Sequence, residues 1–146
     1  MSNSLLTQYD PGEIILNANG IDLAGFAAGS FIKVLRTVDA FGMSVGADGE
    51  TTRVKSQNMS GSISATFVQG SPSNDVLSAL ATQDEISSNA VFPILLKDAN
   101  GTTIASGAKC WIKKKAEVTF AVESESREWT FDIAQLVLTV GGATAL

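Results

Sequence analysis

The chain has 146 residues, of which 45% are hydrophobic and 17% are charged, and its formal net charge is −5. This length and apolar content predict a single domain over residues 1–146 and exclude an intrinsically disordered chain. The acidic balance argues against a surface that binds nucleic acid, because phosphate contacts need an excess of Lys and Arg.

The chain starts with a polar segment, residues 1–12, which ends at the turn signal Asp10-Pro11-Gly12 and is expected to form an N-terminal arm. It has neither the basic start nor the apolar run of a signal peptide, and no apolar stretch is long enough to span a bilayer. We therefore expect a protein made in the cytoplasm, with no membrane insertion of its own. A hairpin follows, with strands at Glu13–Asn17 and Ile21–Leu23 and a turn in which Gly20 supplies a positive φ angle.

Two strand-like segments, Phe31–Arg36 and Ser60–Phe67, enclose a long connection at residues 39–55. The second strand alternates between an apolar set beginning at Gly61 and short hydroxyl residues. The connection contains an Asp-Gly turn signal and apolar residues that a plain linker would lack. Because compact domains avoid long structureless loops, we expect an extended β-hairpin whose strands include 41–45 and 51–55.

One amphipathic helix is expected after Phe67. Ser71 suits the N-cap, Pro72 the first helical position, and Asp75 the first turn, where the helix dipole favours a negative charge. The apolar face of this helix comprises Val76, Leu77, Leu80 and Ala81. We expect this helix to pack over a face or an open end of a sheet.

A second hairpin is predicted from strands Val91–Lys97 and Thr103–Ile112, joined by an Asn-Gly turn. Pro93 places the first of these strands at an edge or a bulge, because proline cannot donate to a ladder. The basic triplet Lys113–Lys115 ends the second strand and is read as a solvated or ion-paired surface.

Three further strands are predicted at Glu117–Glu123, Arg127–Ile133 and Leu136–Val140, before a short C-terminal tail at 143–146. The expected inward-facing residues of the first two are Val118, Phe120, Val122, Trp129, Phe131 and Ile133. The elements together predict a mainly β fold, an antiparallel β-sandwich or barrel with one flanking α-helix and a long extended β-hairpin loop.

The residue inventory disfavours catalysis. The chain has no histidine, which excludes Ser-His and Cys-His nucleophile systems and histidine metal sites. The single cysteine, Cys110, is predicted to be a buried small hydrophobe. The pairs Glu123/Glu125 and Glu128/Asp132 are the remaining acid/base couples, and both are expected on solvent-facing positions. We therefore expect no enzyme, no cofactor and no metal site.

The outward positions of the predicted strands are rich in short hydroxyl residues, among them Ser60, Ser62, Ser64 and Thr66. Such a surface is either an ordinary solvated sheet face or one that does not adhere to anionic partners.

Several motifs together resemble tail tube proteins of contractile-tailed bacteriophages, and the resemblance covers almost the whole chain. The motifs are Gly25–Ile32, Gly46–Glu50 followed by Arg53, Ser71–Ser78, Trp111-Ile112, Arg127–Trp129 and Gly141-Gly142. The resemblance extends to tube proteins of type VI secretion systems and of phage-tail-like bacteriocins, called tailocins.

This resemblance implies homo-hexameric rings that stack into a tube, whose channel passes DNA without binding it specifically. It implies a place in the virion tail after assembly in the host cytoplasm, with the tail sheath, baseplate and tail terminator proteins as partners. A long loop at 39–55 would reach the neighbouring ring, with Phe41, Met43, Val45, Asp48, Glu50 and Arg53 as inter-ring contacts. The candidates for facing a negatively biased lumen are Ser62, Ser64, Thr66, Glu117, Thr119 and Glu123.

Another class of function stays open at this point. A β-sandwich binding module could recognise a carbohydrate or a protein through the 39–55 loop. Trp111 and Trp129 are the only tryptophans, and both are expected to be buried rather than displayed.

Overall fold

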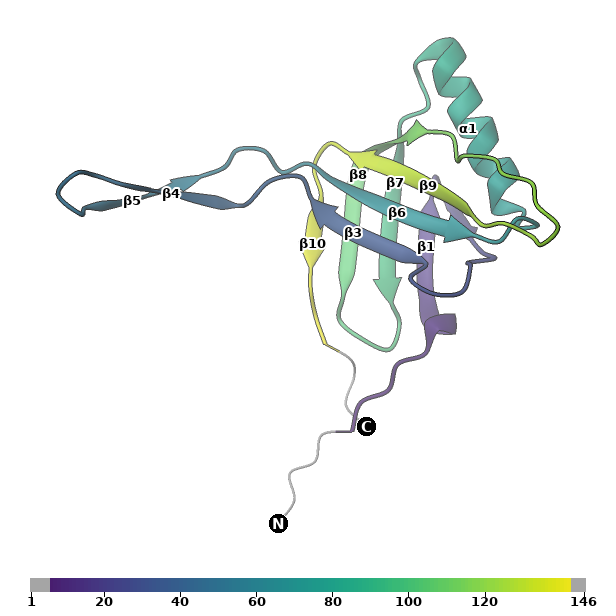
Figure 1. Ribbon diagram of the computed structural model, residues 1–146, viewed down its shortest axis with the longest axis horizontal. Helices are drawn as coiled ribbons and strands as arrows, with labels where there is room; N and C mark the ends of the chain where they lie inside the picture. The colour runs from purple at the N-terminus through teal and green to yellow at the C-terminus, as the bar shows by residue number, and fades with distance from the viewer. Residues whose placement is uncertain (1–5, 143–146) are drawn as a thin grey trace.

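The computed structural model describes residues 6–142, which form ten β-strands, one α-helix and one 3-10 helix (Figure 1). In chain order these elements are η1 (Pro11–Glu13), β1 (Ile14–Ala18), β2 (Ile21–Leu23), β3 (Ile32–Arg36), β4 (Phe41–Val45), β5 (Thr51–Lys55), β6 (Gly61–Phe67), α1 (Ser73–Ser87), β7 (Phe92–Asp98), β8 (Ile104–Lys114), β9 (Arg127–Ile133) and β10 (Val137–Thr139). The expected mainly β fold with one helix is confirmed. The predicted C-terminal tail and the first five residues of the N-terminal arm lie outside the described residues.

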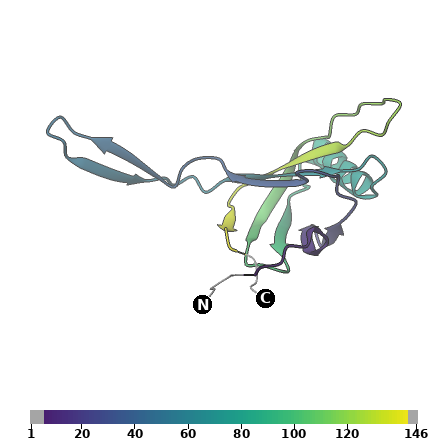
Figure 2. The same ribbon diagram turned by 60° about the horizontal axis from the view of Figure 1, so that its bottom comes forward.

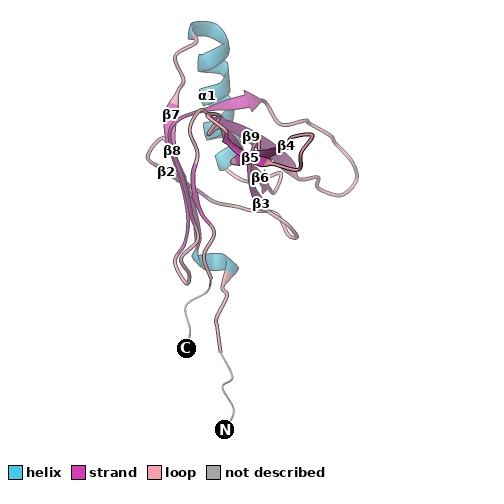
Figure 3. Ribbon diagram, turned by 90° about the vertical axis from the view of Figure 1, so that its left-hand side faces the viewer, coloured by secondary structure: helices cyan, strands magenta, loops and turns pink. Residues whose placement is uncertain are grey.

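Eight of the strands form one antiparallel sheet in the order β2-β1-β7-β8-β9-β6-β3, and β10 also pairs with β8. The first part of β8 pairs with β7 and β10, whereas its last part pairs with β9. The sheet bends along β8, so that β1 and β7 lie across β9, β6 and β3 in a sandwich-like arrangement (Figures 1 and 3). Within residues 6–142, β2 and β3 end the order of the sheet, so it does not close into a barrel.

A glycine permits the close contact of β9 with the bend in β8. A Cβ atom on Gly107 would collide with Cγ2 of Ile133, a buried residue of β9. Any larger residue at position 107 would push these two strands apart.

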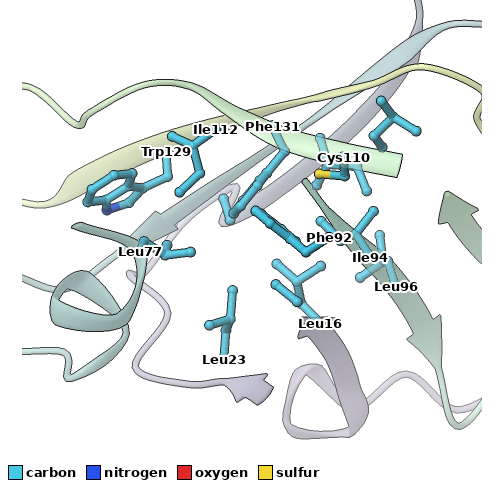
Figure 4. Packing of buried hydrophobic residues seen from close by; sticks show 14 of the residues in the cluster. Leu16, Leu23, Leu77, Phe92, Ile94, Leu96, Cys110, Ile112, Trp129 and Phe131 are labelled. Atoms are coloured by element: carbon cyan, nitrogen blue, oxygen red, sulfur yellow. The ribbon is translucent and has the colours of Figure 1, made fainter. Parts of the chain in front are cut away.

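The core fills the space between the two parts of the sheet and beneath α1 (Figure 4). Alternate residues of β6 and β9 point inward, as predicted, with Trp129, Phe131 and Ile133 buried. Phe131 meets Phe92 of β7 edge to face, with ring centroids 6.2 Å apart. Leu77 adds a fully buried side chain from the helix.

The helix is anchored at its N-terminus. The Ser71 hydroxyl accepts from the Ser73 backbone N–H at 3.2 Å and donates to the Ala24 carbonyl at 2.6 Å. The helix begins one residue later than predicted, at Ser73, so Pro72 and not Ser71 is the N-cap residue. The Ser71 hydroxyl still satisfies one free N–H of the first turn. Asn74 accepts a 3.0 Å hydrogen bond from the Trp129 indole, which ties α1 to β9. No helix within residues 6–142 is long and apolar enough to cross a membrane.

Pro93 lies at an irregularity of the β7–β8 ladder, between Phe92 and Ile94, so the predicted bulge is confirmed.

The strand predicted at Glu117–Glu123 is wrong, because residues 115–126 form a loop between β8 and β9. Val118, Phe120 and Val122, expected to face inward, are 62%, 78% and 106% exposed. Alternation alone predicted a strand here, but a strand also needs a neighbouring strand to pair with. The pairing of β8 with β9 ends at Lys114 and Thr130, and the residues between these two strands have no partner strand within residues 6–142.

Candidate functional site

The connection at 39–55 is a two-stranded arm that projects from the body of the molecule (Figures 1 and 2). Its strands, β4 and β5, have the predicted bounds and pair with each other in a sheet of their own. A hydrogen bond from the Ser56 N–H to the Ala40 carbonyl, 2.8 Å long, closes its base. Every residue of both strands is exposed.

The arm has two chemically different faces, because residues opposite each other in an antiparallel pair point to the same side. One face carries Phe41 opposite Lys55, Met43 opposite Arg53, and Val45 opposite Thr51. The Arg53 guanidinium carbon lies 3.6 Å from the centroid of the Phe41 ring, a cation–π contact. We call this set the apolar-basic face of the arm. The other face carries Gly42, Ser44, Thr52 and Val54.

The tip of the arm is a tight acidic turn. The Glu50 N–H donates to the Asp48 carboxylate at 3.2 Å, and the Gly46 N–H donates to the Glu50 carbonyl at 2.7 Å. Gly49 has φ +85°, which a residue with a side chain rarely adopts, so the predicted Asp-Gly turn is present.

The outer side of β3, β6, β9 and the end of β8 forms a face that is polar apart from Leu35, opposite Ser62, and Trp111, opposite Asp132, and we call it the polar sheet face. Ser62, Ser64 and Thr66 on β6 lie opposite Asp132, Thr130 and Glu128 of β9, respectively. All three β6 residues are half-buried, as an outer face flanked by neighbouring strands requires. This face holds half of the residues that we expected to line a lumen.

The polar sheet face carries both signs of charge. Its acids are Glu128 and Asp132, and Lys33 of β3 lies opposite Ser64. The register of β8 shifts between Ile112 and Lys114, and Lys113 and Lys114 both border hollows lined by Thr130. The sequence predicted a solvated or ion-paired surface for this triplet but did not place Lys113 and Lys114 beside the β9 residues of this face, because the shift in register is not visible in the sequence. The third lysine, Lys115, is ion-paired as expected, 3.6 Å from Glu85.

The other three lumen candidates, Glu117, Thr119 and Glu123, lie on the 115–126 loop instead of on a strand of the sheet. Glu117 and Thr119 nevertheless line one polar hollow together with Thr66 of β6. The structure therefore brings Thr66, Glu117 and Thr119 together in one hollow, and Glu123 does not line it.

The single cysteine lies in the core, as predicted. Cys110 is fully buried, and this burial raises the pKa of its thiol from 9.0 to about 12, with a smaller contribution from the negative charge of Asp132. The thiol is therefore protonated at neutral pH. No cluster of acidic and cysteine side chains within residues 6–142 is arranged to hold a metal ion.

Two comparisons of sequence place the chain among phage proteins. A family model described as the bacteriophage PhiTE tail tube protein matches residues 17–141. The chain is also 32% identical, over 142 residues, to structural protein ORF10 of Pseudomonas phage KPP10. That match covers 92% of this chain and 82% of the phage KPP10 protein.

The fold is similar to that of two components of contractile systems. A chain in the structure of the sheath/tube terminator of PVC, an extracellular contractile injection system, superposes with a TM-score of 0.68 at 11% identity, over 94% of this chain and 100% of that one. The tube-terminating cap of the anti-feeding prophage gives a TM-score of 0.56 at 10% identity, over 94% and 95% of the two chains. At these identities the similarity concerns the fold alone.

Proposed function

Since the chain belongs to the bacteriophage PhiTE tail tube protein family, we propose that its copies assemble into six-membered rings, which stack into a hollow tube that conducts DNA. The tube would be part of the virion tail, assembled in the host cytoplasm and joined to sheath, baseplate and terminator proteins. The protein would have a structural role, forming the wall of the tube, and would perform no catalysis.

The observation that carries this proposal is the projecting arm. A hairpin that displays Phe41, Met43 and Val45 to solvent at 43%, 75% and 59% exposure contributes no buried strand residue to the core of its own subunit. Exposed apolar surface of this kind is typical of protein–protein contacts. The arm is therefore proposed as the inter-ring contact, with Asp48, Glu50 and Arg53 as its polar contacts.

The open sheet supports lateral assembly. Strand β3 ends the order of the sheet, and an exposed edge presents backbone groups that a second chain can pair with. Joining this edge to the next subunit, and repeating the step around a ring, would close one continuous barrel and remove the edges. The polar sheet face would then line the channel.

The electrostatics of such a channel would come from two sources. The polar sheet face is close to charge-balanced, with Lys33, Lys113 and Lys114 against Glu128 and Asp132. A negative bias therefore has to come from Glu125, which borders the same hollow as Glu128, and from the overall charge of −5 per copy. Either source would keep DNA phosphates from adhering.

The structure gives less support to a binding module. Trp129 is buried and Trp111 half-buried, so neither offers the exposed aromatic surface on which such modules rely. The arm remains the one surface through which that alternative would operate.

Electron microscopy tests the proposed function directly. The purified chain, examined by negative staining over a range of concentrations, is expected to form rings and stacked tubes with a common diameter. Chain mass measured in solution by light scattering should rise with concentration in parallel. A compact monomer at every concentration, or single rings that never stack, would contradict the proposal, and glycan-array hits without assembly would favour the binding module.

A further inference from the structure

The 115–126 loop is a second exposed surface that neither the core nor the sheet explains. Val118, Phe120 and Val122 are each more than half exposed. Glutamates at 117, 123 and 125 accompany them, and none of the three takes part in an ion pair within residues 6–142. A loop whose apolar and acidic side chains both remain exposed offers a surface suited to binding a partner protein.

The subunit holds this loop at its ends while leaving its middle exposed. Lys115 is paired with Glu85 of α1, and the Glu125 N–H donates to the side chain of Gln69 at 3.0 Å. The buried Arg127 guanidinium donates to the Glu125 and Ser126 carbonyls at 3.1 and 3.3 Å, and lies 5.6 Å from the Phe120 ring centroid. These contacts present the loop in a defined place.

The loop and the arm lie at opposite ends of the longest axis of the molecule (Figures 1 and 2). A contact between two different surfaces is heterologous, and it builds an open stack instead of a ring when the two surfaces lie at opposite ends and the rotation between copies does not close. Stacked copies would bring the arm of one copy toward the loop end of the next.

The two surfaces are complementary in chemistry. The apolar-basic face of the arm displays three apolar side chains with Arg53 and Lys55. The loop displays three apolar side chains with Glu117 and Glu123. Contact would bury apolar groups on both sides and oppose basic with acidic groups, an arrangement that fixes the choice of partner and its orientation.

We propose that the 115–126 loop is the receptor for the arm, so that the apolar-basic face of one copy docks on the loop of a second copy in the adjacent ring. This proposal rests on the proposed stacking function and assigns the surface that receives the arm.

Pairwise cross-linking tests the contact. Phe120→Cys is combined in turn with Phe41→Cys, Met43→Cys or Val45→Cys, and tubes are treated with a short bismaleimide. Each copy would touch one neighbour through its arm and another through its loop, so at least one double variant is expected to give a ladder of covalent multimers on a denaturing gel. The native Cys110 is fully buried and should stay unreacted.

Matched controls separate a specific contact from random collision. Val54→Cys lies on the other face of the same arm, is 54% exposed, and combined with Phe120→Cys should give no ladder. Each single-cysteine variant should stay monomeric on the gel. A ladder of equal strength from the Val54 pair, dimers from the single variants, or no ladder from any of the three test pairs in visible tubes would overturn the inference.

Charge reversal provides a second measurement in case a cysteine variant fails to assemble. Arg53→Glu with Lys55→Glu, or Glu117→Lys with Glu123→Lys, should each abolish tube growth while leaving the thermal unfolding of the subunit unchanged. The four changes combined should restore growth. Failure of this rescue overturns the receptor assignment alone, whereas failure of the wild-type chain to form tubes overturns the proposed function.

Discussion

At the scale of single residues, Cys110 shows how environment decides chemistry. The same thiol that would be a reactive nucleophile in an electropositive cleft is here a core group, in the same buried cluster as Phe92 and Phe131 (Figure 4). Its raised pKa means that the folded state resists losing this proton more than the unfolded state does. The free energy of unfolding should therefore decrease as the pH becomes alkaline.

The sign of that dependence follows from linkage. Because the pKa is raised from 9.0 to about 12 on folding, the stabilisation is fully present below pH 9 and is lost as the pH rises from 9 toward 12. This group alone should make the protein about 1.4 kcal/mol less stable at about pH 10 than at about pH 8. Urea unfolding at both pH values checks this, with Cys110→Ala as the reference that lacks the group. If both proteins lose the same stability, the thiol does not contribute.

Residue patterns predicted the buried positions well wherever a strand had a neighbour. The alternation of β6 and β9 placed Ile63, Phe67 and Phe131 in the core, because both strands lie inside the sheet. The same kind of alternation failed at Val118, Phe120 and Val122. Periodicity records which side chains share a face, but it does not record whether that face meets a core or solvent.

At the scale of elements, the arm was predictable and its partner was not. The Asp-Gly turn and the residues beside it indicated β4 and β5 with the bounds observed, because hairpin pairing is local in sequence. The bend of the sheet along β8 depends instead on contacts between distant segments, such as Gly107 with Ile133. No local pattern encodes such a contact.

The isolation of the arm makes a deletion informative. Removing residues 39–55 and closing the gap with an Asn-Gly turn should leave a folded subunit, because no residue of either arm strand is buried. The stability of the body should change by less than about 1 kcal/mol, while tube growth is abolished. Circular dichroism with urea unfolding measures the first effect, and electron microscopy the second. Unfolding of the shortened chain would mean that the arm belongs to the core.

At the scale of the whole molecule, the subunit has four surfaces with separate proposed tasks. The arm and the 115–126 loop would act along the tube axis, the β3 edge would act around each ring, and the polar sheet face would line the channel. This division accounts for a chain that buries a conventional core and yet leaves so many large apolar residues outside it, including Met43, Val45 and Phe120. The same division separates two kinds of variant. Variants of the contact surfaces should stop assembly, whereas variants of the polar sheet face should change only how the channel interacts with DNA.

The channel assignment is tested by reversing charge on the polar sheet face. Glu128 and Asp132 lie on β9 opposite Thr66 and Ser62, in the body of the subunit and not on the arm. Glu128→Lys with Asp132→Lys should therefore leave tube growth intact and turn the channel strongly basic. Tubes grown with short DNA should then retain it and protect it from nuclease, whereas wild-type tubes should leave it free.

The reference for this experiment carries the same change of charge elsewhere. Asp75→Lys with Ala79→Lys and Thr82→Lys places the lysines at exposed positions of α1, which covers the core on the side away from the polar sheet face. If the channel assignment is right, this variant binds DNA on the outside of the tube and leaves it open to nuclease. Salt should release DNA from both variants, with a log–log slope of about −0.9 for each phosphate contacted, because both bind through the backbone. Protection by the α1 variant, or equal nuclease sensitivity of both, would place the polar sheet face outside the channel. Protection by the β9 variant alone can arise only if the face formed by β3, β6, β9 and the end of β8 encloses the DNA.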